Sequence, residues 1–177
     1  MTFSWQRFTW DLTKVRVGDG SSPAPFVLRE VDSEEEAVVE KVTGSAFRMD
    51  SGWGNFQDAL LGHLSRQVQS AFAKPEGHRG LVLLHGSRII GSSVIALDAN
   101  ASAHLMTGPC VLHEYRSRGL GTALLQASLA ALASAGLKTA RGIARDRTIA
   151  ARYIYPKFGG IAEPWEPDFE AAPKIAA

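Results

Sequence analysis

Hydrophobic positions in the second half of the chain follow first the spacing of strands and then that of a helix. Residues 81–98 hold two apolar runs around a His-Gly-Ser turn, which predicts a β-hairpin. Residues 104–115 predict a further strand, with a bulge or splay point at Gly108 and Pro109. Residues 120–136 carry no charge and are apolar nearly all round, which predicts a helix buried against a sheet.

The first 25 residues are rich in aromatic side chains and end in a Gly/Pro/Ser cluster that predicts a loop. We expect Phe3, Trp5, Phe8 and Trp10 to pack onto the domain as a short strand or arm. The remaining predicted elements are a strand at 26–31, a helix over 34–47 capped by Asp32 or Ser33, a helix at 56–72, a strand at 138–144, a helix at 148–158 and a last strand from Ile161.

This order of elements predicts one α/β domain over residues 1–177, in which 1–25 form an N-terminal arm. Its sheet should be mixed and mostly antiparallel, with six or seven strands and about four flanking helices. The composition, 45% hydrophobic and 21% charged, is typical of a soluble globular domain. No stretch approaches the roughly 20 apolar residues of a membrane span, and no apolar leader precedes the domain, so we expect a cytoplasmic protein without membrane contact.

Charge and cysteine content exclude several classes of function. The net charge of +1 argues against a nucleic-acid-binding protein, and the lone Cys110 excludes an internal disulfide or a cysteine zinc cluster, so no metal is expected. The charges are nevertheless segregated, because residues 111–160 hold eight basic and two acidic groups while residues 1–60 hold six and ten. A basic segment in a neutral protein indicates a local site for an anion.

The most informative window is VLHEYRSRGLGT at residues 111–122, where a predicted strand leads into the buried helix. Glycines that turn the backbone tightly, two arginines and the positive end of a helix together form a cradle suited to pyrophosphate. The spacing is not that of a dinucleotide fingerprint, which would need a third glycine at Leu124, and no phosphate-loop motif occurs. The alternative is a glycine-rich helix start with solvated arginines.

Two segments resemble the signatures of the GNAT superfamily of N-acyltransferases. Residues 111–121 resemble its acetyl-CoA signature V-x-P-x-x-[QR]-x-x-G-x-[GA], with His113 in place of the proline. Residues 148–160 resemble its second signature, N-x-x-A-x-x-x-Y-x-x-x-G-F, with Thr148 in place of the asparagine and Gly160 in place of the phenylalanine. The resemblance covers a cofactor-binding core at 81–161 and does not extend to the first 25 residues. It implies transfer of an acetyl group from acetyl-CoA to a primary amine of a small molecule or peptide.

The resemblance also assigns roles to individual residues. Backbone groups of Val111 and His113 should pair with the pantetheine arm like an added strand, where the sheet splays. The side chains of Arg116 and Arg118 should hold the pyrophosphate, together with the amides that follow. The full cofactor set is Val111, Leu112, His113, Arg116, Ser117, Arg118, Gly119, Leu120, Gly121, Thr122 and Thr148.

Tyr155 and His104 are the candidate catalytic residues. The resemblance places Tyr155 near the CoA sulfur, where its hydroxyl would donate a hydrogen bond to the departing thiolate. Full proton transfer is less favourable, since a phenol has a pKa of about 10 and a thiol one of about 8.5. His104, on the strand before the cradle, has the reference pKa of a general base, although water or another residue would also serve. The structural alternatives are a packed tyrosine and a buried histidine.

An aromatic set is the candidate acceptor pocket: Phe47, Trp53, Phe56 and Trp165. Core or lid packing is the alternative interpretation. Acidic residues flank this set (Asp50, Asp58, Glu163 and Glu166), which predicts a cationic or free-amine acceptor. Two other functions remain open, a non-catalytic CoA-binding sensor of the same fold and a nucleotide-binding interaction module. Dimerisation is common in the family, so a homodimer is a further expectation.

Overall fold

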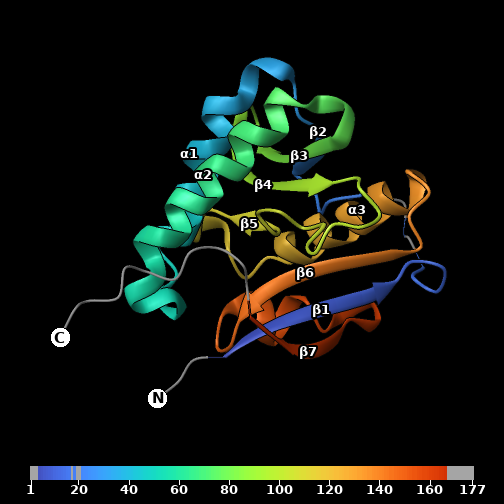
Figure 1. Ribbon diagram of the computed structural model, residues 1–177. Helices are drawn as coiled ribbons and strands as arrows, with labels where there is room; N and C mark the ends of the chain where they lie inside the picture. Colours follow the sequence, from blue (N-terminus) through green and yellow to red (C-terminus); the bar gives the residue numbers. More distant parts are fainter. Residues whose placement is uncertain (1–3, 17, 19–20, 167–177) are drawn as a thin grey trace.

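The computed structural model describes residues 4–16, 18 and 21–166, which form two β-sheets and three long helices (Figure 1). The four-stranded sheet has the order β2-β3-β4-β5, and the three-stranded sheet has the order β6-β1-β7. The strands are β1 (Trp5–Asp11), β2 (Phe26–Glu30), β3 (His78–His85), β4 (Arg88–Ala96), β5 (Cys110–Val111), β6 (Thr139–Arg145) and β7 (Ile161–Trp165). The helices are α1 (Glu36–Arg48), α2 (Gln57–Ala73) and α3 (Leu120–Ser134).

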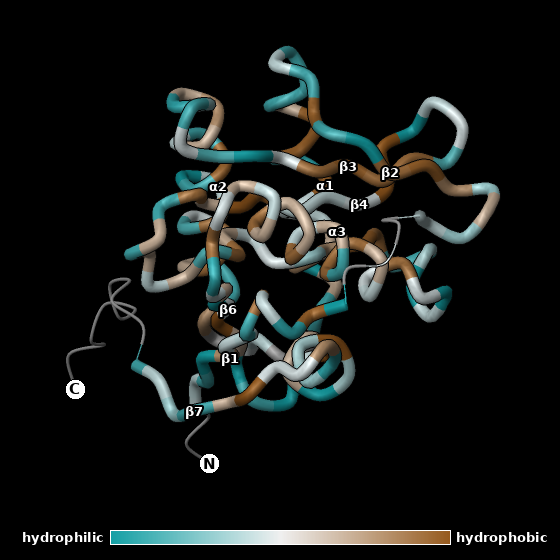
Figure 2. The backbone as a smooth tube through the Cα atoms, turned by 90° about the vertical axis from the view of Figure 1, so that its right-hand side faces the viewer, coloured by the Kyte–Doolittle hydropathy of each residue, from teal (hydrophilic) through white to brown (hydrophobic). Residues whose placement is uncertain are grey.

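Both faces of the four-stranded sheet are covered, as the neighbouring serines of β4 show. The Ser92 hydroxyl lies 3.1 Å from that of Thr43 on α1, and the Ser93 hydroxyl lies 2.8 Å from that of Ser128 on α3. Since successive residues of a strand face opposite ways, α1 packs on one face and α3 on the other. β4 is accordingly buried from Ile89 onward, and the apolar stretches of β2 and β3 lie together beside it (Figure 2).

The aromatic N-terminal segment forms β1, the central strand of the three-stranded sheet. It pairs antiparallel with β6 on one side and with β7 on the other. Phe8 and Trp10 point into a second core with Leu125 and Leu129 of α3, and Trp10 is completely buried. The predicted arm is therefore a core strand; Phe3 lies outside the described residues.

The two sheets separate between β5 and β6, which confirms the predicted splay. β5 pairs with β4 at two positions, and Leu105 alone makes bridges both to β4 and, in parallel, to β6. The strand expected over 104–115 is thus reduced to Cys110–Val111, because Gly108 has a φ of +65° and Pro109 has no N–H to donate. The expected mostly antiparallel α/β fold is confirmed.

The predicted helix at 148–158 is also shorter than expected. The chain forms a π-helical turn at Ala150–Ile154 and, after Pro156, a 3-10 turn at Lys157–Gly159. Proline lacks the N–H needed to continue a helix, and Phe158 has a φ of +59°. None of the helices in the described ranges combines the length and the apolar character needed to cross a bilayer.

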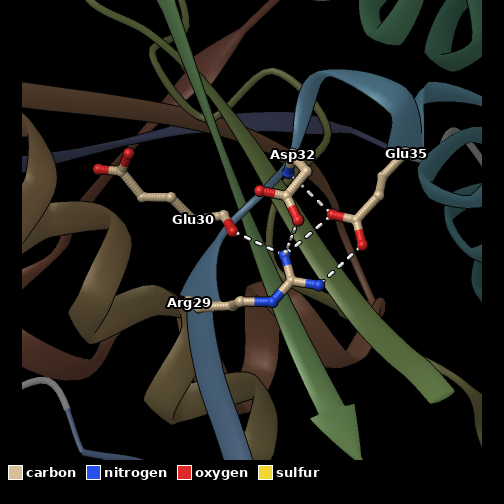
Figure 3. A network of polar contacts seen from close by, with 4 residues as sticks. All are labelled: Arg29, Glu30, Asp32 and Glu35. Carbon is tan, nitrogen blue, oxygen red and sulfur yellow. Dashed lines mark hydrogen bonds and ion pairs between the residues drawn. The ribbon is translucent and has the colours of Figure 1, made fainter. Parts of the chain in front are cut away.

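An ion-pair network fixes the connection between β2 and α1 (Figure 3). The Arg29 guanidinium donates to both carboxylate oxygens of Glu35, at 2.9 and 2.7 Å, and to the backbone carbonyl of Glu30. Glu35 also accepts the backbone N–H of Asp32, at 2.8 Å, so the helical segment begins where the sequence predicts it. The Arg29 guanidinium lowers the pKa of Glu35 to about 2.

Candidate active site

A cleft of about 390 Å³ lies where β5 and the segment after β6 diverge. Four parts of the chain line it: the end of α1 with the turn that follows, β5, the start of α3, and the π-helical turn. The lining residues are Ala46, Phe47, Asp50, Trp53, Pro109, Cys110, Val111, Arg116, Ser117, Gly119, Leu120, Gly121, Thr122, Thr148, Ile149, Ala150, Tyr153, Ile154 and Lys157.

The start of α3 presents unpaired backbone amides to the cleft. Gly119 caps the helix in the left-handed conformation, at a φ of +75°, and the first intrahelical bond runs from the Ala123 N–H to the Gly119 carbonyl. The three amides before Ala123 therefore have no partner within the helix. A Cβ on Gly121 would lie 2.8 Å from the Cδ1 of Ile154, so a larger residue there would require the Ile154 side chain to move. This arrangement is a ready anion site.

The two arginines of the predicted cradle have different environments. Arg116 lines the cleft, and its guanidinium donates to the Ala46 carbonyl at 2.6 Å and to the Val111 carbonyl at 3.3 Å. Arg118 is exposed, does not line the cleft, and contacts the Glu114 carbonyl at 3.4 Å and the Tyr115 ring at 5.6 Å. Of the two arginines, only Arg116 lines the cleft.

Leu112 and His113 are the other members of the predicted cofactor set that do not line the cleft. Leu112 is buried, and its N–H donates to the Ile90 carbonyl at 2.9 Å. His113 is exposed, in a 3-10 turn. The remaining residues of that set all line the cleft.

The edge of β5 turns one residue's backbone groups toward the cleft. In an antiparallel pair of strands, hydrogen-bonded residue pairs alternate with pairs that are not hydrogen-bonded. The Leu112–Ile90 pair is hydrogen-bonded, so the neighbouring Val111–Gly91 pair is not. The N–H and C=O of Val111 consequently point away from β4. The carbonyl accepts the bond from Arg116, and the N–H faces the cleft side. A ligand strand could pair here as the next strand of the sheet would.

Cys110 and Thr148 line the cleft with side chains that are engaged in the protein. The buried Cys110 thiol lies 3.3 Å from the Ser92 hydroxyl, and burial raises its pKa, so it remains a neutral thiol. The Thr148 hydroxyl donates to the Arg145 carbonyl at 2.8 Å and accepts the Ala151 N–H at 3.3 Å. Thr148 thus caps the π-helical turn from its place in the cleft wall.

Tyr155 lies behind the cleft. It is 2% exposed, and its ring packs edge-on against Phe8 and Trp10, with centroids 5.4 and 5.3 Å away. Its hydroxyl lies against the backbone of Gly108, which leads into the cleft. A Cβ on Gly108 would lie 2.5 Å from the Tyr155 hydroxyl oxygen. Burial raises the pKa of this phenol further above its usual value, so Tyr155 is a neutral hydrogen-bond donor.

His104 is not among the cleft-lining residues. It is fully buried, and its Nδ1 accepts the backbone N–H of Arg141 at 2.9 Å, which leaves the proton on Nε2. Nε2 has no hydrogen-bond partner among the described residues. Burial lowers the pKa of this imidazole, and the Arg141 guanidinium acts in the same direction. The structure thus does not bring the candidate base to the cleft.

The predicted acceptor residues divide into two groups. Phe47 and Trp53 line the cleft with ring centroids 5.5 Å apart, and Trp5 lies 5.7 Å behind Trp53. Phe56 lies beneath the Arg145 guanidinium, 4.7 Å from its ring centre, outside the cleft lining.

Trp165 lies in β7 opposite Trp5, with the Arg7 guanidinium 3.9 Å above its ring. Of the acidic residues expected near the acceptor, Asp50 lines the cleft. Glu163 pairs with Arg7 instead, and Asp58 is exposed in the first turn of α2.

Sequence reasoning missed five cleft residues of the π-helical region: Ile149, Ala150, Tyr153, Ile154 and Lys157. Ile149, Tyr153 and Lys157 are four positions apart, and this spacing places residues on one side of a helical turn. Lys157 donates to the Thr122 hydroxyl at 2.9 Å and thereby adds a cation beside the start of α3. The spacing was visible in the sequence, although nothing in it showed which side faces the cleft.

Comparison with known proteins gives one family match. Residues 76–159 match the model of the acetyltransferase (GNAT) domain, and this match spans β3 to the turn after the π-helix. No curated protein is similar enough to count as a match. For residues 76–159, just under half of the chain, this match agrees with the two sequence signatures that resemble the GNAT superfamily.

Solved structures share the fold at low sequence identity. A GCN5-related N-acetyltransferase from Sphaerobacter thermophilus is 18% identical, with a TM-score of 0.65 over 92% of this chain and 49% of that chain. A Drosophila protein is 15% identical, with a TM-score of 0.60 over 92% and 49%. A GCN5-related N-acetyltransferase from Ralstonia eutropha is 18% identical, with a TM-score of 0.55 over 86% and 99%. The chain spans about half the length of the first two.

Proposed function

We propose that the protein transfers the acetyl group of acetyl-CoA to a primary amine by direct attack on the thioester. Acyl transfer is the chemistry of the family, and one observation supports the particular reaction. The open amides of α3 and the outward N–H of Val111 border the same cleft. A polyanion and an extended amide-containing arm are the two halves of CoA, and these two features suit them.

The lining residues fit such a cosubstrate. The amides of Leu120, Gly121 and Thr122 would hold the pyrophosphate, with Lys157 and Arg116 as cations beside them. The backbone of Val111 would pair with the pantetheine arm. Among the cleft-lining residues that the structure describes, only side chains of Asp50, Arg116 and Lys157 carry charge at neutral pH. The two cations therefore match the anionic part of the cosubstrate.

The chemistry requires a neutral amine and a stabilised oxyanion. A primary ammonium, with a pKa of about 10, first gives up a proton to water, since no described histidine lines the cleft. The amine nitrogen then bonds to the thioester carbon, and the carbonyl oxygen becomes an oxyanion to which the Val111 N–H donates. The carbonyl re-forms as the C–S bond breaks, CoA leaves as a thiolate, and the extra proton on the new amide nitrogen passes to that thiolate through water. The role proposed for the neutral Tyr155 hydroxyl is a hydrogen bond to that thiolate, which requires the sulfur to reach Gly108, where the hydroxyl lies.

A test separates this function from the two alternatives. Free thiol is measured during incubation with acetyl-CoA and a panel of amines, and binding of CoA and ADP is compared by calorimetry. Amine-dependent thiol release supports the transferase. CoA binding without release would indicate a sensor, and equal affinity for ADP and CoA would indicate a nucleotide-binding module. The Gly121→Glu variant puts a side chain and a negative charge into the cradle and should abolish both binding and turnover.

A further inference from the structure

We infer that the wall of the cleft formed by Ala46, Phe47, Asp50 and Trp53 is the acceptor subsite, and that it takes a primary amine with one positive charge on an aromatic or branched apolar body. The inference rests on the proposed function and names the substrate class of that site. We refer to these four residues as the acceptor wall.

The charges around the cleft are separated. Lys157 stands beside the α3 amides, Asp50 stands on the acceptor wall, and the Arg116 guanidinium lies between them, bonded to the Ala46 carbonyl. Of the cleft-lining residues that the structure describes, Asp50 is the only carboxylate. One carboxylate matches one ammonium group. A polyamine or an amino sugar with several ammonium groups would have to place the others near Arg116, Lys157 or apolar side chains, where like charge and lost hydration oppose them.

The rest of the acceptor wall is apolar and largely aromatic. Phe47 and Trp53 pack at 5.5 Å, and Trp5 supports Trp53 from behind at 5.7 Å, so the two cleft-lining rings are held in place. Rings fixed in this way gain contact with an aromatic or branched side chain at little cost in side-chain order.

Asp50 is assigned to binding the ammonium group of the acceptor and not to the chemical step. Removing the carboxylate should therefore weaken acceptor binding and leave the chemical step nearly intact. The expected signature is a raised KM for the amine with a nearly unchanged kcat.

The experiment compares phenethylamine, isoamylamine, spermidine and glycinamide as acceptors, with acetyl-CoA saturating and thiol release as the readout. We expect kcat/KM for phenethylamine to exceed that for spermidine about tenfold or more. Asp50→Asn should raise the KM for phenethylamine about tenfold, as expected for loss of a charge-assisted contact. Asp50→Glu should recover part of the loss, and the affinity for CoA should not change. The matched control is Asp58→Asn, at an exposed position outside the cleft, which should behave as the wild type.

A second variant keeps the test decisive if Asp50→Asn does not fold. Phe47→Leu retains an apolar side chain and removes the ring, and it should lower the preference for phenethylamine over isoamylamine. A preference for spermidine, or equal kinetics of Asp50→Asn and Asp58→Asn, would overturn the assignment while leaving the transferase function intact. CoA binding without thiol release from any amine would overturn the proposed function and this assignment with it.

Discussion

Replacing Arg116 by alanine removes the side chain that joins the end of α1 to β5. Ala46 lies in the last turn of α1, where backbone carbonyls have no partner within the helix, and the Arg116 guanidinium occupies that position as a cation. The same guanidinium bonds to Val111, the residue that faces the cleft. We therefore expect Arg116→Ala to destabilise the protein even without CoA.

The structure sets the size of this effect. The 2.6 Å bond from a charged donor to Ala46 is worth about 1.5–3 kcal/mol, and the 3.3 Å bond to Val111 contributes less than about 1 kcal/mol. Because Arg116 is only half-buried, we expect a loss near the lower end, about 2 kcal/mol. For a chain of this size each kcal/mol lowers Tm by about 2–4 °C, so the expected decrease is about 4–8 °C.

Thermal and urea unfolding of the ligand-free protein measure this loss, with Arg118→Ala as the matched control. Arg118 is exposed and holds one carbonyl at 3.4 Å, so its removal should change the unfolding free energy by less than about 0.5 kcal/mol. Equal unfolding midpoints for the two variants would refute the reasoning. Calorimetry with acetyl-CoA then tests the binding role, for which we expect about tenfold or greater loss in Arg116→Ala alone.

Three further outcomes follow from the site and the fold. Tyr155→Phe should preserve folding and CoA affinity and lower kcat roughly tenfold or more, whereas unchanged turnover when chemistry limits the rate would assign the hydroxyl to packing. Lys157→Met should weaken CoA binding and reduce its dependence on salt, as measured by titration at two ionic strengths. The Glu35 pKa is about 2 in the folded protein, so its stabilising effect is complete above about pH 4.5 and is lost as the pH falls toward 2. The difference in unfolding free energy between wild type and Glu35→Gln should vanish over that same range, and a difference independent of pH would contradict the ion-pair assignment.

The parts of the fold that the sequence predicts correctly are those set by local pattern. The hairpin of β3 and β4 follows from two apolar runs around a glycine turn, and α3 follows from a long uncharged segment. The anion cradle was predictable because glycines at a helix start have a local effect on the backbone. These features depend on neighbours within a few positions, which the sequence shows directly.

Long-range contacts decide what the sequence could not predict. Residues 5–11 pair with two strands that follow more than 120 positions later in the chain. The aromatic pattern of residues 5–11 does not indicate which strands these are. Arg116 and Arg118 are two positions apart and equal in chemistry, yet only Arg116 meets the carbonyl of Ala46, 70 positions earlier. His104 has the residue type of a general base, but its ring is fixed against the backbone of Arg141.

The cleft exists because the sheet is interrupted, and the interruption has local causes. Pro109 cannot donate to a ladder, and Gly108 leaves the extended conformation, so β5 is two residues long and has no strand on its second side among the described residues. In a longer β5 with a neighbouring strand, the N–H and C=O of Val111 would have been paired within the sheet. The residues that shorten the strand thus also create the open backbone edge. The helix start that follows nine residues later supplies the amides for an anion. One short segment, residues 108–122, therefore contributes both an opening between the sheets and the polar groups that give this opening its chemistry.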